Sequence, residues 1–292
     1  MKIKPLSRRY WLQAVLALIF MAASLAGCTS QGGGNPQPEE LNHLFDRDWA
    51  ANTFWDDGLA EVATYAAERV IYNKSRPFDY TLITVKEDFN KAYNVKTDQY
   101  DRKDLFPVMK VNQFCRIPTD NYPYHFMTAM FFRRDNPLYL HKMTSSSQEW
   151  CGTTFKAITQ AGNHFLFAFN SYWDGQGAGK MNLPPDLIFE DQLCYTLRSL
   201  KFKEGLTFSA EVAGLLQTSN ANPPTLYQAA FRVSPDQAAG QPVWRVQVAL
   251  SPERKNTYWF ARVYPHLLVQ QQTWDGRSLV LKEVKRFAYW KH

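Results

Sequence analysis

Three cysteines in the long C-terminal part of the chain carry the most obvious chemistry: Cys115, Cys151 and Cys194. A cysteine nucleophile needs a nearby base and a lowered thiol pKa. The histidines that could serve as that base stand at no diagnostic spacing from any cysteine: His125, His141, His164 and His266. We therefore expect buried or bridged cysteines, with a hydrolase acting through Cys151 as an alternative. Three cysteines allow one disulfide, and their spacing does not select its pair.

Adjacent carboxylates offer a second kind of chemistry. They occur at Asp56–Asp57, Glu87–Asp88 and Glu190–Asp191, and two carboxylates can hydrolyse a glycoside when a fold brings them together. Nothing in the sequence selects a pair, so we expect these residues at turns or on solvent-exposed faces. The sequence has neither a CxxC nor an HExxH spacing, and we predict no metal site and no cofactor. The glycine-rich stretch before Lys180 is not a phosphate loop, because Met181 stands where a hydroxyl is required.

Aromatic residues are unusually frequent, at 15% of the chain. Phe165, Phe167 and Phe169 alternate along one predicted strand and share one face, and Trp173 follows them. Packing in a hydrophobic core is the simpler explanation, because each aromatic ring buries a large area. The alternative is an apolar groove that binds a lipid chain or a lipidated peptide, with these four residues in its wall.

The beginning of the chain has the layout of an export signal. Four cations and no acid precede an uncharged run from Tyr10 to Ala26, which is short for a membrane-spanning helix. The run ends in Leu25-Ala26-Gly27-Cys28, which resembles the bacterial lipobox. That resemblance implies that residues 1–27 are removed and that Cys28 becomes the lipid-bearing first residue of the mature protein.

Residues 28–44 are predicted to form the lipidated cysteine and a flexible tether, because glycine, serine, glutamine and proline bury little apolar area. The acyl chains would hold the protein to a membrane of the bacterial cell envelope. We expect the outer membrane, since Thr29 replaces the aspartate that often marks retention at the inner membrane. The net charge of +6 includes the four signal cations, and the remaining 29 basic and 27 acidic side chains are nearly balanced. This balance argues against a nucleic-acid partner.

The remaining chain reads mostly as β-strands. Alternating apolar residues and β-branched residues predict these strands. Arg76-Pro77 is expected to separate the first predicted strand from the second, and Asp275-Gly276 indicates a hairpin turn between the last two. The predicted strands are Glu61–Tyr72, Tyr80–Phe89, Leu105–Ile117, Tyr124–Phe132, His164–Trp173, Thr207–Ala213, Leu226–Val233, Val243–Leu250, Thr257–Tyr264, His266–Trp274 and Ser278–Tyr289.

One helix is predicted, over Asp186–Leu200, with Asp186 as its cap and leucines at helical spacing. The predicted fold class is therefore mainly β (α+β), a curved antiparallel sheet or half-barrel that wraps one central helix. Residues 45–292 would form this β-rich domain, with room for two β subregions that meet near residues 174–186.

The stretch Asp186–Tyr289 resembles the periplasmic half-barrels related to bacterial lipoprotein carriers. The resemblance rests on the order of its parts: a helix ending in Thr196-Leu197-Arg198-Ser199-Leu200, then consecutive strands up to a closing pair at His266–Val269 and Leu279–Lys282. It implies a fold more than a function.

The stretch from Trp55-Asp56-Asp57-Gly58 through Val70, together with Ser147–Gly152, is similar to segments of uncharacterised bacterial lipoproteins, some of them automatically labelled septum formation inhibitor Maf. Maf proteins carry Ser-x-Ser-Pro-Arg-Arg, and Asn73–Pro77 departs from that order. We therefore expect a non-enzymatic envelope lipoprotein that binds or carries an apolar envelope ligand or assists envelope assembly. An exported hydrolase using Cys151 or a carboxylate pair, and a scaffold that recruits an envelope protein through its sheet edges, are the alternatives.

Overall fold

The computed structural model describes residues 41–291. Cys28, the predicted export signal and residues 28–40 of the predicted tether lie outside the described residues. Sixteen strands of this part form one sheet. The strands are β1 (Ala60–Ile71), β2 (Lys74–Asn90), β3 (Val95–Lys96), β4 (Leu105–Ile117), β5 (Tyr124–Arg133), β6 (Leu140–Glu149), β7 (Gly152–Ala161), β8 (His164–Asn170), β9 (Ala178–Leu183), β10 (Ile188–Phe189), β11 (Thr207–Ala213), β12 (Leu226–Ala238), β13 (Gln241–Ala249), β14 (Lys255–Ala261), β15 (Leu268–Gln272) and β16 (Ser278–Phe287).

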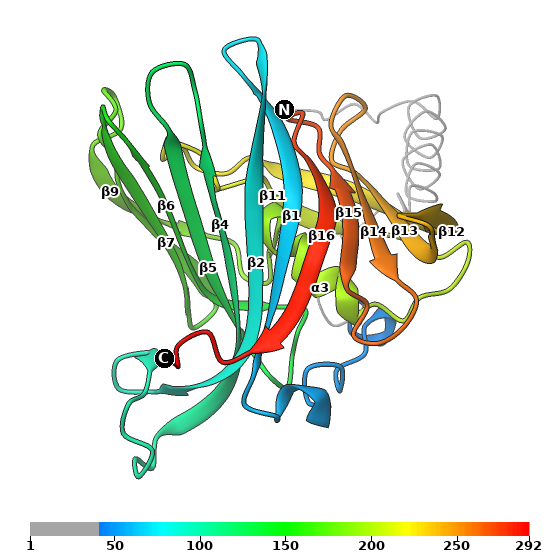
Figure 1. Ribbon diagram of the computed structural model, residues 1–292. Coiled ribbons are helices and arrows are strands. Elements are labelled where there is room, and N and C mark those ends of the chain that lie inside the picture. Colours follow the sequence, from blue (N-terminus) through cyan, green and yellow to red (C-terminus); the bar gives the residue numbers. More distant parts are fainter. Residues whose placement is uncertain (1–40, 292) are drawn as a thin grey trace, which may run out of the picture. The chain divides into compact units, whose positions relative to one another are not determined.

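The sheet is open and curved, which confirms the predicted fold class (Figure 1). Strand β1 lies in the middle, paired with β2 on one side and with β16 on the other, so the beginning and end of the domain meet at its centre. Strands β9 and β10 are the two edges. The chain crosses from one edge to the other through residues 184–187, close to the expected junction of two β subregions, yet both subregions belong to this one sheet.

Successive strands run antiparallel, except that β10 and β11 are parallel. The connections therefore alternate between two ends of the sheet. One end of the sheet, here called the turn end, carries the connections β1–β2, β4–β5, β6–β7, β8–β9, β11–β12, β13–β14 and β15–β16. The N-terminal segment, with η2 (Asn42–Leu44) and η3 (Thr53–Trp55), packs at the other end, where the Tyr264 hydroxyl donates to the Trp49 carbonyl at 2.8 Å.

The central helix is present but much shorter than predicted. A 3-10 turn η4 (Glu190–Gln192), a four-residue helix α3 (Leu193–Thr196) and a 3-10 turn η5 (Leu197–Ser199) replace the expected Asp186–Leu200 helix. Asp186 is not its cap: it has a φ of 61°, and Ile188–Phe189 pair with β11 instead. Pairing with a strand edge thus outweighs local helix propensity here.

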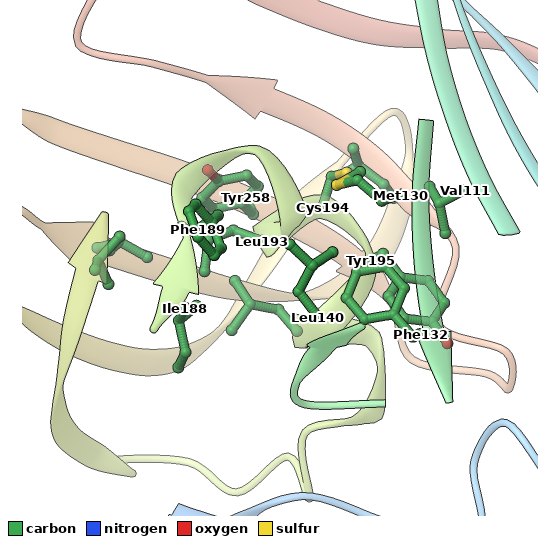
Figure 2. Packing of buried hydrophobic residues seen from close by; sticks show 14 of the residues in the cluster. Val111, Met130, Phe132, Leu140, Ile188, Phe189, Leu193, Cys194, Tyr195 and Tyr258 are labelled. Atoms are coloured by element: carbon green, nitrogen blue, oxygen red, sulfur yellow. The ribbon is translucent and has the colours of Figure 1, made fainter. Parts of the chain in front are cut away.

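Every residue of this helical segment is buried in the concave side of the sheet. Figure 2 shows Tyr195 beside Phe132 of β5. Its ring stacks on Phe132 with the centroids 4.4 Å apart, and Phe189 meets Phe165 edge-on at 5.4 Å. The segment thus joins the inward faces of both halves of the sheet into one hydrophobic core.

Most predicted strands are confirmed within a few residues, including the turn at Asp275-Gly276. Arg76-Pro77 was expected to end a strand, which is wrong: both lie inside β2, and the turn falls at Tyr72-Asn73, where φ is positive. Strands β6 and β7 were missed, because Ser145, Ser147 and Lys156 alternate into the interior where apolar residues were expected.

Candidate functional site

The loop of residues 214–225 closes the concave side of the sheet at the turn end, and we call it the crossing loop. It leaves β11 and reaches the opposite half of the sheet. The Ser145 hydroxyl of β6 donates to the Leu216 carbonyl at 3.1 Å, and the Lys156 ammonium of β7 donates to the Thr218 and Asn220 carbonyls at 2.7 and 2.6 Å. Trp173 Nε1 donates to the Ser219 carbonyl at 2.7 Å.

Glu190 and Asp191 hold the near side of this loop. They were expected at a turn or on a solvated face, which is wrong: they are only 5% and 4% exposed. The two Asp191 oxygens accept the Leu216 and Gln217 amides at 2.7 and 2.9 Å, and Glu190 Oε2 accepts the Leu215 amide at 3.0 Å. Burial raises the pKa of both carboxyl groups. Because these oxygens already accept backbone amides, the pair supports the loop.

The other carboxylate pairs are engaged in ion pairs. Asp56 and Asp57 follow η3 at a turn, as expected, and pair with Arg134 and Arg286. Glu87 pairs with Lys110 across β2 and β4.

A pocket of about 170 Å³ opens beside the crossing loop at the turn end, and we call it the mouth pocket. Its charged and aromatic walls come from five parts of the chain: β1, η4, the start of β12, the β13–β14 turn and the β15–β16 turn. The side chains that carry its chemistry are Arg69, Glu190, Tyr227, Arg254, Trp274 and Asp275.

Arg254 is the most distinctive group of the mouth pocket. Its guanidinium lies over the Trp274 ring, 4.2 Å from the centroid, and 5.7 Å from the Tyr227 centroid. Its Nη1 donates to the Tyr227 hydroxyl. Within residues 41–291 no carboxylate forms an ion pair with Arg254. A guanidinium fixed by aromatic rings and left without an acid is suited to binding an anion.

Both acids of the mouth pocket already have partners. Arg69 Nη2 lies 3.0 Å from Asp275 Oδ2. Burial opposes ionisation of Asp275, but Arg277 and Arg69 together lower the pKa of its carboxyl group. Glu190 Oε1 accepts the Asn256 amide and Trp274 Nε1 at 2.8 and 2.9 Å.

A buried polar network continues behind the mouth pocket. Arg277 Nη1 donates to Gln217 Oε1 at 2.7 Å, and the Tyr80 hydroxyl reaches both Gln217 and Gln113. The Gln113 amide then donates to Cys194 Sγ at 3.0 Å. Arg277 Nε and Gln217 Nε2 are buried donors with no acceptor among the described residues. The interior is therefore polar and rich in hydrogen-bond donors beneath the crossing loop.

The aromatic residues proposed as a groove wall divide between two places. Phe165 and Phe167 are 2% and 0% exposed and belong to the hydrophobic core. Phe169 packs at the edge of that core and covers Gly179 of β9. Trp173 lies apart from the other three, bonded to the crossing loop.

The three cysteines are separate thiols. Cys115 and Cys194 are buried, and burial raises their thiol pKa to about 11 and about 12 respectively. Cys151 is exposed in the β6–β7 turn. Of the candidate bases, His125 lies beside Arg116 Nε at 3.2 Å and His141 beside Asn94 Oδ1 at 2.7 Å. No interaction of the described residues joins Cys151 to a histidine.

The outward face of the sheet carries two further grooves. One of about 480 Å³ runs over β2, β4, β5 and β6, past Phe114, His125 and Met127. The other, of about 470 Å³, runs over β11–β14, past Arg232 and Lys255. No three histidine, cysteine, aspartate or glutamate side chains of residues 41–291 gather as metal ligands. None of the helices in that range has the length and apolar character to cross a membrane.

The comparisons with known proteins describe the fold alone. No family model and no curated protein matches the chain. A solved structure of a β-barrel-like protein of domain of unknown function DUF1849 from Brucella abortus matches 78% of this chain and 98% of its own, at 8% identity and a TM-score of 0.46. A DUF1089 family protein from Pseudomonas aeruginosa matches 55% of this chain and 82% of its own, at 14% identity and a TM-score of 0.36.

Proposed function

We propose that this protein is a membrane-anchored lipoprotein of the bacterial cell envelope whose half-barrel binds a small anionic group at the mouth pocket without catalysing a reaction. The observation that carries the ligand assignment is Arg254, fixed between Tyr227 and Trp274 with no carboxylate partner in the described chain. The anion would be a carboxylate or a phosphate, since both accept hydrogen bonds from a planar guanidinium.

The packing of the interior favours this site over an apolar groove. The helical segment and the crossing loop occupy the concave side, and Phe165 and Phe167 contact other core residues. The loop is held by hydrogen bonds from both halves of the sheet, so opening it would leave buried carboxylates and an ammonium without partners. A small group at the mouth requires no such opening.

Binding of inorganic phosphate and of acetate to the whole chain, each measured by titration calorimetry, tests the ligand class and separates its two sources. We expect Arg254→Met to weaken binding of the preferred anion at least tenfold. Arg232→Met is the matched control, because Arg232 is an exposed arginine of β12 with no ion pair in the described chain. Equal affinity of the Arg254→Met variant and the wild-type protein would exclude the mouth pocket as the anion site.

The membrane address has its own test. Cys28→Ala removes the thiol that would accept the diacylglyceryl group, so the protein should move from the membrane fraction to the soluble fraction. Retention of this variant in the membrane fraction would refute the lipoprotein assignment and leave the anion-binding test unaffected.

A further inference from the structure

A second surface at the turn end gathers four aromatic rings, two of them exposed and two half-buried, and the mouth pocket does not include it. It consists of Tyr72, Tyr122, Tyr124 and Trp150, here called the aromatic platform. Tyr72 stands in the β1–β2 turn, Tyr122 and Tyr124 at the β4–β5 connection, and Trp150 in the β6–β7 turn. Because β1, β2, β4, β5, β6 and β7 are consecutive neighbours in the sheet, these connections lie next to one another (Figure 1).

The rings of the platform are fixed by one another. Trp150 stacks on Tyr122, with the centroids 6.1 Å apart and the planes at 26°. Tyr122 and Tyr124 are 5.6 Å apart, and Tyr124 and Tyr72 are 6.4 Å apart. The Tyr72 hydroxyl shares hydrogen bonds with the hydroxyls of both other tyrosines. The platform is thus rigid before any ligand binds, which lowers the entropic cost of binding.

Large apolar area remains exposed on this rigid surface. Trp150 is 78% exposed and Tyr72 is 61% exposed. Only one face of the Trp150 ring is used by Tyr122, so the other is open to solvent. Exposed aromatic residues that gather in this way usually mark an interaction surface.

Charged and polar groups border the rings. The Asp120 carboxylate accepts Lys74 Nζ at 2.8 Å and Arg76 Nη1 at 2.7 Å, and it remains 56% exposed. A flat apolar face therefore lies beside several groups that can accept or donate hydrogen bonds.

This combination matches a sugar ring better than a lipid bilayer. A pyranose has an apolar C–H face that covers an aromatic ring and hydroxyl edges that need hydrogen bonds. Insertion into a bilayer would instead desolvate Lys74 and Asp120, and charged side chains are costly to transfer out of water into the hydrocarbon region. We propose that the aromatic platform binds a glycan chain, with a sugar ring stacked on Trp150 and its hydroxyls directed to Asp120 and Lys74.

The test uses the whole chain and two glycan probes: a β-1,4-linked tetramer of N-acetylglucosamine, titrated by calorimetry, and peptidoglycan, used in a pelleting assay. We expect at least one probe to bind, Trp150→Ala to weaken that binding at least tenfold, and Trp150→Phe to retain most of it. Trp290→Ala is the matched control, because Trp290 is a partly exposed tryptophan at the other end of the sheet.

Vesicles of phosphatidylethanolamine and phosphatidylglycerol form the competing arm, with the Cys28→Ala background used to remove any acyl chain. Three results would overturn the proposal. Both glycan probes could fail to bind, or Trp150→Ala could leave glycan binding unchanged. The third is that Trp150→Ala weakens vesicle binding rather than glycan binding. Circular dichroism checks that Trp150→Ala is folded. None of these results depends on Arg254, so this proposal and the anion site fail or stand separately.

Discussion

The buried ion pair between Glu61 and Arg198 should be the most sensitive polar contact of the fold. Arg198 Nη1 and Nη2 donate to the two Glu61 oxygens at 2.7 and 2.9 Å, and the side chains are only 1% and 3% exposed. Arg198 also donates to the Pro265 carbonyl at 3.0 Å and lies over the rings of Trp49 and Trp55. One guanidinium therefore joins η5 to β1, to the β14–β15 connection and to the N-terminal segment.

Arg198→Met keeps an unbranched apolar side chain but leaves the Glu61 carboxylate buried without a partner. Breaking a buried ion pair from one side costs about 3–5 kcal/mol. The cation–π contacts with the two tryptophans contribute about 0.5–2 kcal/mol of their own, which overlaps with that figure. We therefore expect the free energy of unfolding to fall by about 3–5 kcal/mol.

Urea unfolding followed by tryptophan fluorescence measures this change, because Trp49 and Trp55 lie against the substituted group. Arg245→Met serves as the control: its pair with Asp236 is about a third exposed, and such surface pairs contribute about 0–1 kcal/mol. The double variant Glu61→Leu/Arg198→Met should recover most of the loss, because replacing both ions by apolar side chains is often neutral. A loss for Arg198→Met no larger than that for Arg245→Met would refute the reasoning.

Two further predictions concern the contacts that position the turn end. Burial lowers the pKa of Lys156 to about 8. Between pH 8 and about 10.5, the ordinary lysine pKa, the unfolded chain therefore binds more protons than the folded protein. The free energy of unfolding should rise with pH in that window, by at most about 1.4 kcal/mol per pH unit. Urea unfolding between pH 7.5 and 9.5 checks this, and an equal slope in Lys156→Met would contradict it. Gly152→Ala would place a Cβ atom 2.3 Å from Tyr172 Cγ, so it should cost about 1–3 kcal/mol. Thermal unfolding should show that the cost largely disappears in a Tyr172→Ala background, and persistence there would exclude the clash.

The sequence predicts the sheet well because alternation is a local signal. Leu105–Ile117 is β4 to the residue, and Asp275-Gly276 forms the turn where it was expected. Strands β6 and β7 escape the pattern because their inward residues are partly polar: Ser145 and Lys156 face the interior to bond the crossing loop. Their partners are more than 60 residues away in the chain, so no local period could reveal them.

The candidate site was harder to predict for the same reason. Glu190-Asp191 looks like any solvated acidic pair, and only the amides of Leu215–Gln217 explain its burial. Arg254 likewise has no informative neighbour in sequence, since its aromatic partners are Tyr227 and Trp274. The available signal was indirect: Pro223-Pro224 and the polar residues before them mark a long connection, and long loops in compact domains often carry function.

The polar network beneath the crossing loop changes where a ligand is expected on this fold. In a half-barrel with an apolar concave side, the ligand and the core compete for the same surface. Here the crossing loop is bonded to both halves of the sheet, which leaves the turn end as the place where unpaired groups meet solvent. The mouth pocket and the aromatic platform both lie there. The N-terminal segment packs at the opposite end (Figure 1). Both proposed sites therefore lie at the end of the sheet remote from the N-terminal segment that contains η2 and η3.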